Sequence, residues 1–177
     1  MMWLESLLRP SVLCSSLTKL EFYRDREVEC FTEEQETLLL ANSLEEIGFV
    51  RCDSLQYLPA WLHTLHNLKT LHLEFDSSQI RSLPDVLPSS LQNLYIEGCH
   101  KILLLPDVLP SSLQELHING CSEIRSLPDR LPNSLQELVI EDCEKINLLP
   151  KDALPSSLQK LKIWSCPAIR SLPKVDG

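Results

Sequence analysis

The sequence predicts an α/β solenoid, a single curved array of repeated units with a parallel sheet on its concave side. Three observations predict it: a pattern L-x-x-(L/I)-x-(L/I/F) recurs, each unit holds a short alternating apolar stretch, and later units end in Leu-Pro. The leading leucines, 22 to 27 residues apart, are Leu17, Leu44, Leu68, Leu91, Leu113, Leu135 and Leu158. A short, nearly constant period is the signature of a repeat architecture. We therefore expect residues 1–177 to form one domain of about seven units.

Each unit contains one predicted strand. Apolar residues alternate with polar ones, as Leu94 and Ile96 do on either side of Tyr95, and a period of two predicts a strand with one buried face. Stacking of the units then aligns these strands in a parallel sheet. The predicted strands span residues 17–23, 44–50, 68–74, 91–97, 113–119, 135–141 and 158–164.

The segments that return from one strand to the next are predicted to be mostly non-helical after residue 84. In three units a second proline follows the Leu-Pro pair four residues later, as Pro110 follows Pro106. Proline restricts its own backbone and that of the preceding residue, so this spacing argues against an α-helix. The convex side is therefore expected to be Pro-rich and extended or 3₁₀.

Two helices are predicted in the earlier units. Thr32 and Gln35 form a capping-box pattern ahead of good helix formers, which predicts a helix over residues 33–41. Pro59 stands just before a second, shorter stretch compatible with a helix. The longer spacing between the first two units is explained by the first of these helices.

Composition and charge weigh against several classes of function. The chain has 16 Lys and Arg against 25 Asp and Glu, a net charge of -9, which opposes the phosphate contacts that dominate nucleic-acid binding. No run of 18 apolar residues is present, so no membrane span is expected. The N-terminus is a poor secretory signal, and seven cysteines, an odd number, fit reduced thiols better than disulfides. We expect a cytoplasmic or nuclear protein.

A cysteine or aspartate recurs eight residues after each leading leucine. These residues are Asp25, Cys52, Asp76, Cys99, Cys121, Cys143 and Cys166. Neighbouring strands lie about 4.8 Å apart, which brings the cysteines within disulfide range and raises a metal site or a redox ladder as one interpretation. A buried structural ladder is favoured, because aspartate takes the same place twice and reactive thiols need an exposed, electropositive setting. Cys14 and Cys30 lie outside this register.

The sequence offers no constellation for catalysis. His72 and His117 both occupy outward strand positions, but two strands separate them, about 10 Å, so one metal ion cannot bind both. Cys99 and His100 are adjacent residues that point apart, and no third group orients them. We therefore expect no enzymatic activity, no cofactor and no bound metal.

The outward strand residues form the concave surface, where repeat proteins usually bind partners. In the middle of the array these residues are largely acidic, whereas the last strand is basic and carries an indole. Tyrosine, tryptophan and charged residues are typical of binding hot spots, although a solvated face is the alternative for any single position. The predicted partner-binding residues are His72, Glu74, Tyr95, Glu97, Glu115, His117, Asn119, Glu137, Val139, Glu141, Lys160, Lys162 and Trp164.

The consensus L-x-x-L-x-L-x-x-(N/C), present from Leu17 to Pro173, resembles the leucine-rich repeat. The finer texture, "LPSSLQELHINGCSEIRSLPD" and "SLQKLKIWSCPAIRSLPK", resembles the C-terminal repeats of plant nucleotide-binding leucine-rich-repeat (NBS-LRR) disease resistance proteins. This resemblance implies a horseshoe solenoid that acts in plant innate immunity. The implied partner is a pathogen effector, a guarded host protein or an autoinhibited nucleotide-binding module. No phosphate-loop motif is present, so we expect a fragment of a longer receptor.

Secreted bacterial leucine-rich-repeat effectors are the alternative relatives. Their units also carry Leu-Pro and Pro-x-Ser-Leu turns, and their repeats bind a host protein. Those repeats usually run about 20 residues with asparagine at the ladder position, whereas the regular units here run 22 to 24 residues with cysteine. The repeat length and the ladder residue therefore favour the plant family.

Overall fold

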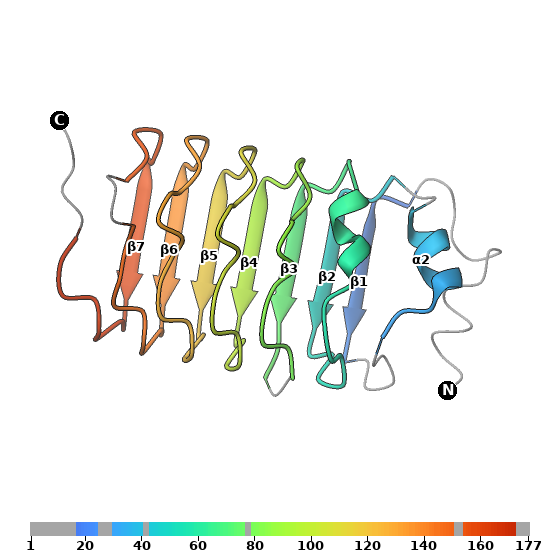
Figure 1. Ribbon diagram of the computed structural model, residues 1–177, viewed down its shortest axis with the longest axis horizontal. Helices are drawn as coiled ribbons and strands as arrows, with labels where there is room; N and C mark the ends of the chain where they lie inside the picture. The colour runs from blue at the N-terminus through green and yellow to red at the C-terminus, as the bar shows by residue number, and fades with distance from the viewer. Residues whose placement is uncertain (1–16, 25–29, 41–42, 77–78, 151–153, 173–177) are drawn as a thin grey trace.

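The computed structural model describes residues 17–24, 30–40, 43–76, 79–150 and 154–172, and it is a solenoid with one parallel sheet. Seven strands lie side by side in chain order, and the return segments cross the opposite face (Figure 1). The strands are β1 Lys19–Tyr23, β2 Glu46–Val50, β3 Thr70–Glu74, β4 Asn93–Glu97, β5 Glu115–Asn119, β6 Glu137–Glu141 and β7 Lys160–Trp164. The predicted fold class is confirmed.

Every strand begins two residues later than the range predicted from the sequence. In the last four units the leading leucine belongs to the turn before the strand, because its backbone N–H donates to the carbonyl of a proline three residues earlier. Leu113 N, for example, lies 3.0 Å from Pro110 O, and Leu135 N lies 3.0 Å from Pro132 O. The side chains of both leucines are nevertheless fully buried, so the apolar pattern extends beyond the hydrogen-bonded strand.

All six strand pairs are parallel and share one register, in which each residue of a strand pairs with the equivalent residue of the next strand and no bulge occurs. Each row of equivalent residues therefore runs straight across the sheet. The inward rows form the core: Leu71, Leu94, Leu116 and Leu138 stand in register, and each is 0% exposed.

The helical elements lie near the N-terminal end of the sheet. Helix α2 spans Glu33–Leu40, as predicted except for residue 41, which lies outside the described residues. The second predicted helix is the 3₁₀ helix η1, Ala60–Thr64, whose start is closed by a bond from Leu62 N to Pro59 O. In the described residues beyond η1 no helix occurs, in agreement with the proline spacing.

The return segments are extended, and two pairs of neighbouring segments are joined by backbone bridges. Isolated parallel bridges join Ser82 to Leu104 and Ser126 to Leu148. The return segments after β3, β4, β5 and β6 each contribute a buried isoleucine to the core, as Ile102 and Ile124 do, both 0% exposed. None of the helices within the described ranges is long and apolar enough to cross a bilayer.

Candidate functional site

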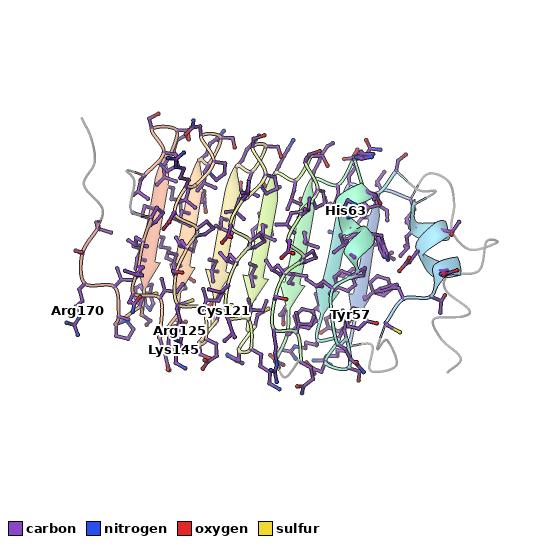
Figure 2. All side chains as sticks on the ribbon, viewed as in Figure 1. Tyr57, His63, Cys121, Arg125, Lys145 and Arg170 are labelled. Atoms are coloured by element: carbon purple, nitrogen blue, oxygen red, sulfur yellow. The ribbon has the colours of Figure 1, made fainter. Side chains whose placement is uncertain are left out.

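The recurring cysteines lie two residues beyond the strand ends and form a ladder that is interrupted at Asp76. The thiol of Cys121 lies 3.4 Å from Asn119 O in its own unit and 3.5 Å from Ile96 O in the preceding strand. In Figure 2 it stands at the edge of the sheet where the strand arrows end. The equivalent pair of carbonyl acceptors recurs for Cys52, Cys99, Cys143 and Cys166. Each thiol therefore joins its own turn to the unit before it.

The environment of these thiols is unfavourable for nucleophilic chemistry. Cys121 and Cys143 are both 0% exposed, and all six cysteines within the described residues are free thiols. Burial raises the pKa of the Cys143 thiol to about 12. The hydrogen bond with the Cys121 sulfur, followed by burial, also raises the pKa of the Cys99 thiol. A buried thiol with a raised pKa holds its proton at neutral pH, so Cys99 and Cys143 suit a structural role. The hydrogen bond with Cys99 lowers the pKa of Cys121, but this thiol is 0% exposed and is therefore closed to reagents.

The two aspartates predicted for this ladder differ from the cysteines. Asp76 is exposed, and its carboxylate lies 3.4 Å from Arg51 Nε. The prediction of a buried ladder residue is therefore wrong at this position. Phe75, which is 1% exposed, fills the interior one residue earlier and turns Asp76 towards solvent. Asp25 and Cys14 lie outside the described residues.

A second ladder, made of serines, runs along the other end of the strands and was missed from the sequence. Ser112 Oγ donates to Leu91 O at 2.6 Å, and Ser134 Oγ donates to Leu113 O at 2.6 Å. Ser90 and Ser157 make the equivalent bonds. The signal was the constant serine before each leading leucine in the "PSSL" and "PNSL" turns. The serine hydroxyls link neighbouring units before the strands begin, and the cysteine thiols link them after the strands end.

The concave face carries a central row of outward residues in direct register. The row reads Glu21, Gly48, His72, Tyr95, His117, Val139 and Lys162 from β1 to β7. Three rings stand together in its middle. The ring centroids of His72 and Tyr95 are 6.0 Å apart, those of Tyr95 and His117 are 4.9 Å apart, and both pairs meet edge to face. Such contacts hold the three rings as one half-buried aromatic row.

Acidic side chains flank this aromatic row. Tyr95 donates its hydroxyl to Glu115 at 2.7 Å, and burial together with this bond raises the pKa of Tyr95. Glu97 Oε1 lies 3.5 Å from His72 Nε2, and Glu137 Oε1 lies 2.9 Å from His117 Nε2. The middle of the concave face therefore presents carboxylates in contact with aromatic rings.

Lysines close the two ends of the face. Lys19 Nζ on β1 lies 2.9 Å from Glu46 Oε2, and Lys160 Nζ on β7 lies 2.8 Å from Glu137 Oε1. Lys162 forms an ion pair with Glu141. The hydrogen bond from Lys160, with the charge of the same lysine, lowers the pKa of Glu137. The lysines of the concave face thus lie on the terminal strands, and the acidic residues of β4 and β5 face the central rings.

The predicted partner-binding residues all lie on one face of the sheet, but one of them, Val139, is buried. Trp164 is 64% exposed on β7, whereas Val139 on β6 is only 7% exposed, although both belong to outward positions. Val139 is flanked in register by His117 and Lys162, whose longer side chains leave little room for solvent around it. Val139 is therefore not available as a contact residue, a correction to the prediction. The roles of the other twelve residues stay predictions.

One cluster on this face contains metal-ligand types. The candidate ligand atoms of His72, Glu74 and Glu97 all lie within 4.8 Å of one another. Arg51 Nε lies 3.2 Å from Glu74 Oε1 and already brings a positive charge to the cluster. A metal ion would have to share Glu74 with this guanidinium, so the three residues fit a metal poorly.

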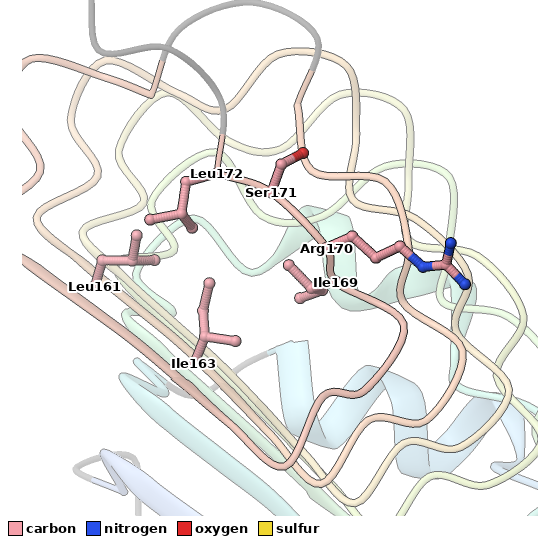
Figure 3. Close-up of a pocket in the computed structure, with 6 residues that line it drawn as sticks. All are labelled: Leu161, Ile163, Ile169, Arg170, Ser171 and Leu172. Carbon is pink, nitrogen blue, oxygen red and sulfur yellow. The ribbon is translucent and has the colours of Figure 1, made fainter.

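Two hollows are relevant to binding. At the last unit, Leu161, Ile163, Ile169, Arg170, Ser171 and Leu172 surround an open hollow of about 440 Å³ (Figure 3). A smaller hollow of about 120 Å³ lies on the concave face over Gly48. Its lining includes Glu21, Glu46, His72 and Tyr95, so it joins the aromatic row to the acidic groups of β1 and β2.

Comparisons with known proteins agree with this architecture. A family model described as the FNIP repeat matches residues 79–121. Among solved structures, the leucine-rich repeat domain of the type III effector XCV3220 (XopL) is similar to this chain, with a TM-score of 0.61 and 23% sequence identity. The match covers 90% of this chain and 64% of that chain, so this chain spans less than two thirds of its length. No curated protein matches. The leucine-rich-repeat type of fold is confirmed by these comparisons.

Proposed function

We propose that this chain is a non-catalytic protein-recognition module whose concave face binds a partner protein. The observation that carries the proposal is the row of His72, Tyr95 and His117, whose rings contact one another and are bordered by Glu97 and Glu115. Aromatic rings fixed on a rigid sheet, with charged groups at their edges, supply the contact area and the orientation that binding hot spots require. The thiols of Cys52, Cys99, Cys121 and Cys143 take no part, because they lie buried at the strand ends.

The biological setting favoured by the comparisons is a secreted bacterial effector whose repeats bind a host protein. The supporting observation is the similarity to the repeat domain of a type III effector over 90% of this chain. A plant immune receptor of the NBS-LRR type is the second candidate. It is supported by the repeat length of 22 to 24 residues, by the cysteine ladder and by the quoted repeat texture. Both settings imply a protein partner inside a host or plant cell, which agrees with the expected cytoplasmic or nuclear location.

A pull-down experiment with variants of the two faces tests whether the concave face binds the partner. The chain is immobilised and exposed to plant-leaf extract in three forms: the wild type, a Tyr95→Ala/Trp164→Ala variant of the concave face, and a Leu104→Ser/Val108→Ser variant of the return side. Leu104 and Val108 are 59% and 77% exposed, so they are matched controls for loss of an exposed apolar group. We expect quantitative mass spectrometry to find proteins lost from the concave variant and kept by the control. Equal retention by all three forms would contradict the proposal.

The reading frame around the coding sequence separates the two settings. A phosphate-loop motif G-x-x-x-x-G-K-[ST] in frame upstream supports the receptor. A secretion leader upstream, or a catalytic domain downstream, supports the effector. Long-read sequencing of the transcript or locus gives this result without any assay of binding.

A further inference from the structure

Gly48 occupies the centre of β2, and nothing in the backbone requires a glycine there. Its φ lies outside the left-handed region, unlike those of Gly98 and Gly120, which are +62° and +64°. The register with β1 and β3 is continuous, so no bulge is present. Glycine inside a strand weakens it and otherwise marks a place where a ligand or another chain approaches closely.

The missing side chain creates the hollow of about 120 Å³ on the concave face. A Cβ at position 48 would lie 3.1 Å from Glu21 Cγ, and no backbone atom is among its nearest neighbours. The neighbouring positions of the row are filled by Glu21 on β1 and His72 on β3. The hollow is therefore a gap in an otherwise continuous row of side chains, one residue wide.

The chemistry of the lining selects a cation. Glu21, Glu46 and Lys19 line the hollow on one side, so two carboxylates stand beside one ammonium group, and the rings of His72 and Tyr95 line it on the other. Within the described ranges no ion pair joins Glu21 to another residue, and Glu46 pairs with Lys19, whose side chain is 65% exposed. The hydrogen bond with Glu46, and to a smaller extent the charge of Glu21, raises the pKa of Lys19. Carboxylates beside aromatic faces suit a guanidinium or ammonium group, which combines charge-assisted hydrogen bonds with stacking on a ring.

We propose that the hollow over Gly48 receives a Lys or Arg side chain of the partner protein. This inference rests on the proposed function and names the chemistry of the partner at one position. The aliphatic stem crosses Gly48, the only row residue without a side chain to obstruct it, and the charged head reaches Glu21 and Glu46. The partner segment is therefore basic at the point where it crosses β2.

Nuclear magnetic resonance offers a direct test because the chain has only four glycines. The probe is the peptide Ac-Gly-Ser-Arg-Ser-Gly-NH₂, titrated into ¹⁵N-labelled protein. We expect a saturable shift of the Gly48 amide resonance, with Gly98 and Gly120 unchanged as internal references. A peptide with citrulline in place of arginine keeps the shape without the charge, and we expect it to bind at least about tenfold more weakly. Equal binding of the citrulline peptide would overturn the inference.

Two variants separate the hollow from general acidity. Gly48→Val fills the gap with a residue that favours strands and removes no charge, although its Cβ would lie 3.1 Å from Glu21 Cγ and would shift that side chain. We expect the peptide-induced shifts around position 48 to disappear while the remaining spectrum stays that of a folded protein. Glu21→Gln removes one carboxylate from the exposed side of the lining and should weaken binding by about fivefold. Val139→Ala serves as the matched control, because Val139 belongs to the same row but lies on β6, four strands along the sheet from Gly48 on β2, and it should leave binding unchanged.

The remaining outcomes are also decisive. Unchanged binding in Gly48→Val, or equal shifts at all acidic surfaces, would overturn the inference. Saturable shifts at Gly48 with zinc chloride and none with the arginine peptide would replace the side chain with a metal ion. A partner retained equally by the wild type and by Gly48→Val would leave the proposed function standing and this inference refuted. Arginine binding without any retained partner would do the reverse.

Discussion

Replacing Gly98 by alanine tests the turn that follows each strand. Gly98 has a φ of +62°, and an added Cβ would lie 2.8 Å from the backbone oxygen of Phe75. The left-handed conformation costs an alanine about 1 to 2 kcal/mol. The contact with a backbone oxygen cannot be relieved by a rotamer change, and we assign it a further cost of about 1 to 2 kcal/mol. We therefore expect Gly98→Ala to lower the free energy of unfolding by about 3 kcal/mol.

Gly120→Ala is the matched control, since Gly120 has a φ of +64° but its added Cβ would meet nothing closer than 3.5 Å. It should lose only the conformational part, about 1 to 2 kcal/mol. Urea unfolding followed by far-ultraviolet circular dichroism measures both variants against the wild type. If the two substitutions cost the same, the close approach of Phe75 O to Gly98 does not exist in solution and the packing described at this turn is wrong.

Three further predictions concern the ladder, the exposed indole and pH. Labelling of the native protein with a maleimide, read by mass spectrometry, should modify the exposed Cys30 rapidly and Cys121 only after denaturation; fast native labelling of Cys121 would refute the structural ladder. Trp164→Ala should change the unfolding free energy by less than about 0.5 kcal/mol because the indole is 64% exposed; a larger loss would place it in the core. Since the pKa of Glu137 is lowered by Lys160, the pair adds stability above the ordinary glutamate pKa of 4.5 and loses it as pH falls through the lowered value. Lys160→Met should flatten this part of an unfolding profile measured from pH 6 to 2, and an unchanged profile would contradict the assignment.

The sequence predicted the sheet well because one periodicity controls it. Leu94, Tyr95 and Ile96 alternate between core and surface, and the same alternation in every unit predicts both strand order and register. The predicted strands start two residues too early, because the leading leucine is buried like a strand residue but makes no hydrogen bond within the sheet. Leu113 is fully buried, yet its N–H bonds a turn carbonyl. A hydrophobic pattern reports burial and carries no information on the hydrogen-bond partner.

The candidate site was only partly predictable for a similar reason. Alternation assigns Val139 and Tyr95 to the same face, but it does not show that the neighbours of Val139 cover it. Position in the repeat likewise placed Asp76 in the cysteine ladder, whereas Phe75 takes the interior space there. The hollow over Gly48 depends on neighbours from β1 and β3, which only the assembled sheet brings together. These features depend on contacts between units, and a pattern within one unit does not contain them.

The central claim, that the concave face is the binding surface, is tested most directly by site-specific photo-crosslinking. A photoreactive phenylalanine derivative replaces Tyr95 on the concave face or Tyr57 on the return side, which is 59% exposed and serves as the matched position. Both proteins are irradiated in plant-leaf extract. The account predicts a discrete crosslinked protein from position 95 that is absent from position 57. The same product in equal yield from both positions, or from position 57 alone, would contradict it.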